Sequence, residues 1–115
     1  AILGMGADGH TASLFPGIPA LEEGTRWVLA VTAPPSAPSP KRLTLTLPVL
    51  THSAHTHFIV EGSEKAHAVG RVLSGRAEIA RFPAAGVRPA DGTRRGRGAA
   101  GPDPLRGHPD DLASR

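Results

Sequence analysis

In AILGMGADGHTASLFPG, residues 1–17, a short apolar run is followed by three closely spaced glycines. The run at residues 1–3 is typical of a buried strand that enters a tight loop. Gly4, Gly6 and Gly9 permit tight turns and let a ligand come close to backbone N–H groups. In open α/β sheets, ligands bind just beyond the carboxyl ends of strands. The sequence therefore predicts a ligand-binding loop here.

Two residues of this loop can carry chemistry. The imidazole side chain of His10 can take a proton from water. Asp8 can orient the imidazole or hold a substrate hydroxyl, and Thr11 and Ser13 add hydroxyl donors. The other interpretation is a structural turn whose polar groups satisfy one another, and the residue types leave both open. A dinucleotide fingerprint is matched only loosely, because Pro16 interrupts the long helix that should follow.

The rest of the chain alternates strand and helix patterns. Strands are expected at 26–32, in the alternating RLTLTL segment (42–47) and at 57–62. A brief helical turn is expected at 10–15, a short helix at 48–54 that Pro48 opens, and a longer helix that Ser63 caps and Gly75 ends. The apolar spacing assigns the buried face of the longer helix to Ala66, Val69, Val72 and Leu73.

These elements predict an α/β fold for residues 1–93, partly Rossmann-like, with a mostly parallel sheet and flanking helices. Residues 33–40 form a proline-rich surface loop, and residues 79–89 form an apolar docking segment. Because the chain opens on an apolar strand without a methionine, we expect it to be truncated at its N-terminus. Residues 94–115 contain almost no hydrophobic residues and no periodicity, so they are expected to be a disordered basic tail.

Composition excludes several classes of protein. The sequence pI is about 10.6, but the excess of arginine lies in the tail and only four aromatic residues offer stacking surface, so no nucleic-acid partner is expected. No apolar run approaches the roughly 20 residues of a membrane span, so no membrane association is expected. The absence of cysteine excludes disulfides and thiolate sites and suits the cytoplasm.

Two cations are candidates for binding phosphate. Lys65 lies near the first turn of its helix, where the macrodipole disfavours a cation unless an anion is bound there. Arg42 opens a strand and can form a bidentate pair with phosphate. The alternatives are a solvated lysine and a solvent-facing arginine. The histidines at 52, 55 and 57 span a helix end and a strand start and should not converge, so no metal site is expected.

Four segments resemble the 6-phosphogluconolactonase family. LGMGADGHTASLFPG (3–17) closely resembles the family signature, and further matches lie at 37–50, 58–75 and 82–93. The wider superfamily includes glucosamine-6-phosphate deaminase and shares the Gly-x-Gly-x-Asp-Gly-His core. The deaminase-like pattern has an acidic residue shortly after the histidine. Here those positions are Ala12, Ser13, Leu14, Phe15 and Pro16, which favours the lactonase.

The resemblance implies hydrolysis of 6-phospho-D-glucono-1,5-lactone to 6-phosphogluconate in the pentose phosphate pathway. His10 would be the base that activates water, Asp8 would assist it or bind sugar hydroxyls, and Arg42 and Lys65 would bind the 6-phosphate. Gly6 and Gly9 would line the substrate-binding site. The resemblance implies no cofactor. The family is about twice this length, so the fragment is expected to be impaired. The alternatives are a sugar-phosphate isomerase or deaminase of the superfamily, and a non-catalytic remnant that binds sugar phosphate.

Overall fold

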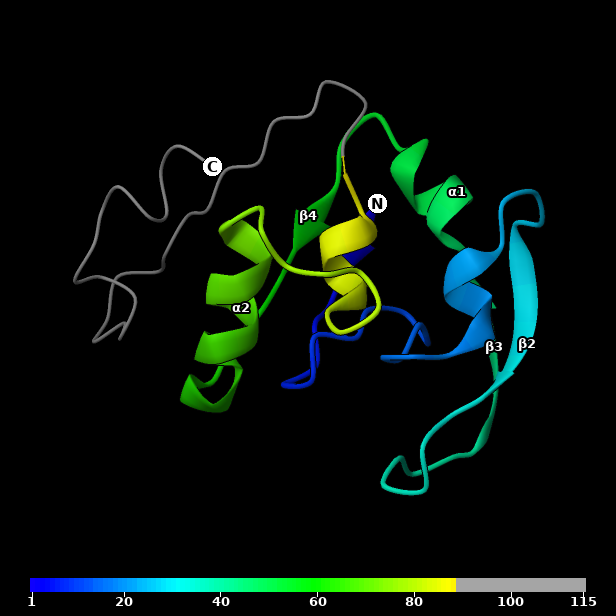
Figure 1. The fold of residues 1–115 in the computed structure, drawn as a ribbon, viewed down its shortest axis with the longest axis horizontal. Helices are drawn as coiled ribbons and strands as arrows, with labels where there is room; N and C mark the ends of the chain where they lie inside the picture. Colours follow the sequence, from blue (N-terminus) through cyan, green and yellow to red (C-terminus); the bar gives the residue numbers. More distant parts are fainter. Residues whose placement is uncertain (89–115) are drawn as a thin grey trace.

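The computed structural model describes residues 1–88, which form an α/β arrangement of short strands and helices (Figure 1). The strands are β1 (Ile2–Leu3), β2 (Val28–Thr32), β3 (Lys41–Leu45) and β4 (His57–Phe58). The helices are α1 (Leu47–Thr51) and α2 (Ala66–Leu73), with 3-10 helices η1 (Pro19–Glu22), η2 (Ser63–Lys65) and η3 (Pro83–Gly86). The predicted α/β class is confirmed.

The strands form two separate pairs. β1 pairs with β4 in parallel, with Ile2 opposite His57 and Leu3 opposite Phe58. β2 and β3 form an antiparallel hairpin in which Val28 lies opposite Leu45. The expectation of a mostly parallel sheet is therefore met by only one of the two pairs in residues 1–88. The connection at 33–40 is too short for a parallel crossover, which needs about a dozen residues or more, so the chain returns directly as a hairpin.

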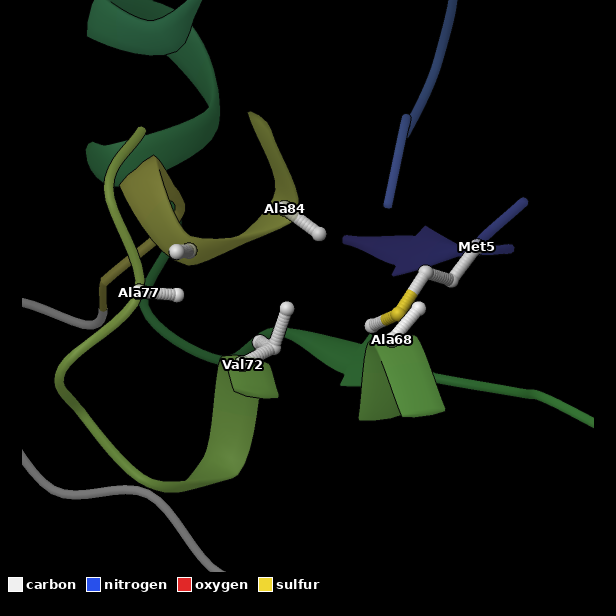
Figure 2. Close-up of a cluster of buried hydrophobic side chains, with 6 residues drawn as sticks. Met5, Ala68, Val72, Ala77 and Ala84 are labelled. Atoms are coloured by element: carbon white, nitrogen blue, oxygen red, sulfur yellow. The ribbon is translucent and has the colours of Figure 1, made fainter. Parts of the chain in front are cut away.

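A buried cluster joins the loop after β1 to α2 and η3. Its members are Met5, Ala68, Val72, Ala77, Ala84 and Ala85. Figure 2 shows the Met5 side chain reaching from the end of β1 to Ala68 on α2. Four of the six side chains are alanines, so the backbones of α2 and η3 can come close together. This packing fixes the glycine-rich loop against α2.

The predicted helix exists, but its start differs from the expectation. A turn of 3-10 helix occupies Ser63–Lys65, and Lys65, not Ser63, is the N-cap residue of α2. Of the predicted face only Val72 is fully buried, whereas Ala66, Val69 and Leu73 are half-buried. The other buried residue of α2 is Ala68, which was not predicted. Gly75 follows the helix with φ +72°, as predicted for a left-handed end.

In β3 and the residue that follows it, the threonine side chains face the interior and the leucine side chains face solvent, the reverse of what hydrophobicity predicts. Thr44 and Thr46 are buried, whereas Leu43 is 74% exposed and Leu45 is 45% exposed. The Thr46 hydroxyl donates to the carbonyl of Arg26 at 2.5 Å, and the Thr44 hydroxyl donates to the carbonyl of Leu45 at 2.9 Å. Burial of a hydroxyl costs little when it is hydrogen-bonded, so the threonine face can turn inward.

Several bounds are narrower than the sequence predicts. α1 ends at Thr51 instead of 54, and β4 has two residues instead of the six at 57–62. The apolar docking segment is buried only in part: Pro83–Gly86 and Val87 are buried, whereas residues 79–81 and 88 are exposed. The boundary at 93/94 and the tail at 94–115 lie outside the described residues. Within residues 1–88, no helix is long and apolar enough to cross a membrane.

Candidate active site

The glycine-rich loop closes on itself directly after β1. The N–H of Gly6 donates to the carbonyl of His10 at 2.9 Å, and the N–H of Gly9 donates to the carbonyl of Gly6 at 2.9 Å. A Cβ atom on Gly6 would overlap the His10 imidazole and the Asp8 carboxylate. Gly9 has φ +84°, and a Cβ there would lie 2.6 Å from Cδ1 of Phe82. Both positions therefore require glycine for the shape of the loop.

Asp8 holds His10 through two hydrogen bonds to a single oxygen. Asp8 Oδ1 accepts from the backbone N–H of His10 at 3.0 Å and lies 2.5 Å from Nδ1 of its ring. An ionised carboxylate only accepts hydrogen bonds, so the pair favours the neutral tautomer of His10 that carries its proton on Nδ1 and has its lone pair on Nε2. The His10 and Asp8 side chains are 30% and 46% exposed, so water reaches the pair. The arrangement is suited to proton abstraction at Nε2.

Phe15 brings a distant arginine beside this pair. Its ring centroid lies 4.6 Å from that of His10 at an interplanar angle of 33°. The guanidinium carbon of Arg42 lies 5.5 Å from the same ring, and Arg42 Nε donates to the carbonyl of Ser39 at 2.9 Å. The His10 imidazole and the Arg42 guanidinium therefore contact the same aromatic side chain. No sequence pattern assigns a role to Phe15, although it is the one phenylalanine, tyrosine or tryptophan of a loop built from small residues.

The two hydroxyl residues of the loop are engaged in the fold. Thr11 is 1% exposed, and its hydroxyl donates to the carbonyl of Gly4 at 2.8 Å. The N–H of buried Ser13 donates to the Thr44 hydroxyl at 3.0 Å, which ties the loop to β3. The predicted helical turn at 10–15 is wrong. Thr11 and Leu14 instead form a tight reversal, with Ala12 at φ +49°.

Lys65 lies at the same edge of the fold as the loop. Because β1 and β4 are parallel, the segments that follow them leave the pair at the same end, and Figure 1 shows the start of α2 on that side. Lys65 is half-buried at the N-cap of α2, a position where the helix macrodipole disfavours a cation. The contacts among the described residues link Asp8, His10 and Arg42 through Phe15, and they do not include Lys65.

Other features of the described residues lie apart from this cluster. Residues 1–88 contain no group of three histidine, aspartate or glutamate side chains that could hold a metal. His52 Nδ1 instead lies 3.0 Å from the carbonyl of Pro48. An open hollow of about 550 Å³ between η1 and β2 is lined by Ile18–Ala20, Glu22, Glu23 and Leu29–Thr32. No predicted site residue faces it, so the candidate site rests on the contacts around His10.

Comparison with known proteins agrees with the signature. Residues 1–95 match the family described as glucosamine-6-phosphate isomerases/6-phosphogluconolactonase. This chain belongs to that family. The 6-phosphogluconolactonase of Mycobacterium tuberculosis is 47% identical over 86 residues, which are 75% of this chain and 34% of the mycobacterial protein. The chloroplastic 6-phosphogluconolactonase 3 of Arabidopsis thaliana is 49% identical over 72 residues, or 63% of this chain and 22% of that protein.

Solved structures of the family share the fold of this chain. The 6-phosphogluconolactonase of Trypanosoma brucei superposes with a TM-score of 0.67 at 30% identity, over 76% of this chain and 35% of that one. The enzyme of Thermotoga maritima gives 0.63 at 33% identity, over 79% and 38%. The predicted family membership is confirmed. The chain spans roughly a fifth to two fifths of the length of these relatives.

Proposed function

We propose that this chain carries the base and phosphate-binding cations of a 6-phosphogluconolactonase, which hydrolyses 6-phospho-D-glucono-1,5-lactone to 6-phosphogluconate. The observation that carries the proposal is the Asp8–His10 pair, in which the carboxylate occupies Nδ1 at 2.5 Å. The other ring nitrogen, Nε2, has no contact with Asp8 and can take a proton from water. The relatives described above carry the name of this hydrolase and support the assignment.

The geometry leads to a base-assisted ester hydrolysis. Nε2 of His10 removes a proton from water as the oxygen attacks the lactone carbonyl carbon, and Asp8 stabilises the imidazolium that forms. The tetrahedral intermediate collapses by breaking the bond between that carbon and the ring oxygen. The imidazolium returns its proton to the departing oxygen, so the products are a carboxylic acid and a sugar hydroxyl. His10 ends neutral, and the chemistry requires no cofactor.

The phosphate of the substrate is assigned to Arg42 and Lys65. Arg42 is held over Phe15 beside His10, and Lys65 stands at the N-terminus of α2, where an anion is favoured. Gly6 and Gly9 shape the loop and allow the substrate to approach its backbone. In the complete fold, we infer that the β1–β4 pair belongs to a larger parallel sheet. The lack of cysteine supports the cytoplasm as its location.

Two other functions are alternatives, and the experiment described below distinguishes them from the lactonase. A sugar-phosphate isomerase or deaminase is suggested by the description of the family, which includes glucosamine-6-phosphate isomerases. The second alternative is a chain that binds sugar phosphate without catalysis. It is suggested by the match to only 34% of the mycobacterial protein, since residues of the remaining part would be missing from the site. The first would act on an amino sugar phosphate, and the second would bind 6-phosphogluconate without turnover.

A chimera tests the proposal. Residues 1–88 are placed in the mycobacterial relative instead of its matching segment, and hydrolysis of freshly prepared 6-phosphogluconolactone is followed, corrected for its spontaneous rate. We expect turnover that disappears in His10→Asn, and little or none from the 115-residue chain alone. A folded chimera that hydrolyses no lactone, or that converts glucosamine 6-phosphate instead, would contradict the assignment. Turnover by the isolated chain that is lost in His10→Ala would overturn the expected impairment.

A further inference from the structure

Phe15 stands apart from the other aromatic residues of the chain. Its side chain is only 3% exposed, yet both of its ring neighbours are ionisable groups that the proposed function uses. The His10 imidazole lies 4.6 Å from it, and the Arg42 guanidinium carbon lies 5.5 Å from it. His10 and Phe15 belong to the same loop, whereas Arg42 comes from β3, so the contact with Arg42 joins two segments that are distant in the sequence.

We propose that Phe15 is a positioning residue that sets the spacing between the proton-accepting imidazole and the phosphate-binding guanidinium. An arginine side chain has several rotatable bonds, and the hydrogen bond from Nε to Ser39 restrains only one end of the guanidinium. The electron-rich face of a buried ring attracts the cation and restricts the remaining freedom. The inference rests on the proposed roles of His10 and Arg42.

The rigidity of the surroundings makes this spacing effective. Leu14 beside Phe15 is fully buried, and the N–H of Ser13 binds the hydroxyl of Thr44, which is two residues from Arg42 on the same strand. The ring is therefore held by the loop on one side and by β3 on the other. A base and a cation at a fixed spacing favour substrates whose anionic group lies at a matching distance from the reacting carbonyl. The expected substrate class is phosphorylated lactones over unphosphorylated ones.

The first measurement uses the free 115-residue chain and needs no ligand. Phe15 is replaced by pentafluorophenylalanine, which keeps the shape of the ring but removes its attraction for a cation. Phe58, which packs in the core, receives the same replacement as a control. Solvent exchange of the Arg42 Nε–H is then measured by NMR. We expect it to become about two- to fivefold faster in the Phe15 variant and to stay unchanged in the Phe58 variant.

Unchanged exchange in the Phe15 variant, or an equal change in both variants, would overturn the positioning role. Because this readout involves no substrate, it decides on Phe15 even if the lactonase assignment fails. In the mycobacterial chimera, Phe15→Leu should raise KM for the phosphorylated lactone more than for gluconolactone, whereas Phe15→Tyr, which keeps the ring, should restore part of the preference. Equal losses on both lactones would show that Phe15 only supports the fold.

Discussion

The clusters around Phe15 and Phe82 contain the same residue types but differ in their chemistry. Phe82 lies between His67, at 6.0 Å between ring centroids, and Arg71, at 5.8 Å, much as Phe15 lies between His10 and Arg42. His67 and Arg71 are both exposed on α2, and no ion pair among the described residues includes His67. His10, by contrast, has a carboxylate 2.5 Å from Nδ1 and packs on a buried ring.

A histidine and an arginine in contact with one aromatic ring are therefore not sufficient to indicate an active site. What distinguishes the Phe15 cluster is a partner that fixes which imidazole nitrogen is free. The Phe82 cluster therefore provides a matched control for each variant of the Phe15 cluster.

The largest difference between the two clusters is expected in kcat when His10 and His67 are replaced. In the mycobacterial chimera, His10→Asn should lower kcat by about 10²–10⁴-fold, the usual loss when a general base is removed. His67→Asn should leave kcat within about twofold, because its ring lies on an exposed face of α2. Steady-state kinetics on freshly prepared lactone would measure both. Similar losses of kcat in the two variants would show that His10 has no catalytic role that His67 lacks.

Replacement of the arginines should give the next largest difference. Arg42→Ala should raise KM for 6-phosphogluconolactone by roughly 10- to 150-fold, the loss of a charge-assisted contact of about 1.5–3 kcal/mol. Lys65→Ala should behave in the same way, and Arg71→Ala should change KM little. The comparison substrate is unphosphorylated gluconolactone, whose KM should be affected much less. Losses of equal size on both lactones would exclude a phosphate role for Arg42 and Lys65.

Gly9 connects the two clusters, and its replacement should cost stability. Gly9→Ala places a Cβ at φ +84°, 3.0 Å from the backbone Cα of Phe82 and 2.6 Å from its ring. Positive φ and the clash together should lower the free energy of unfolding by about 1–3 kcal/mol, measured by urea denaturation of the chain. Gly4→Ala is the control, because a Cβ there meets nothing within 4 Å. Equal stability of the two variants would show that the loop does not depend on Phe82.

The smallest effect is expected at Ala12, which turns the loop between His10 and Phe15. Its φ of +49° is strained for alanine, so Ala12→Gly relieves the folded state by about 1–2 kcal/mol. Glycine also increases the conformational entropy of the unfolded chain, which costs about 0.4–1 kcal/mol. The net change in the unfolding free energy should therefore lie between about 0 and 1.6 kcal/mol, on the stabilising side. A clear loss of stability would mean that the alanine methyl group packs against the loop.

The sequence predicted the elements of this fold better than their environment. Alternation at 42–47 correctly identified β3, but hydrophobicity alone does not reveal that Thr44 and Thr46 are buried. Their burial depends on hydrogen bonds to Arg26, Ser13 and Leu45, which come from the tertiary fold. The parallel pair of β1 and β4 agrees with the expected mostly parallel sheet, although the sequence did not indicate which strands pair. The hairpin of β2 and β3 differs from that expectation because the connection between these strands is short.

The candidate site was predictable in part for a similar reason. Asp8 and His10 are two residues apart, so their pairing could be expected from local sequence, and the structure brings them together. Arg42 joins them only through Phe15, a contact between a loop and a strand that no local pattern encodes. The roles of these residues, and the place of Lys65 beside them, stay predictions.

The central claim is that Asp8 holds the proton on Nδ1 of His10 and leaves Nε2 as the base. Long-range nitrogen–proton NMR of the 115-residue chain, recorded where His10 is neutral, reports directly which ring nitrogen carries the proton. We expect a protonated Nδ1 and an unprotonated Nε2 at His10, and loss of this preference in Asp8→Ala. A His10 ring protonated mainly on Nε2 in the unmodified chain would contradict it.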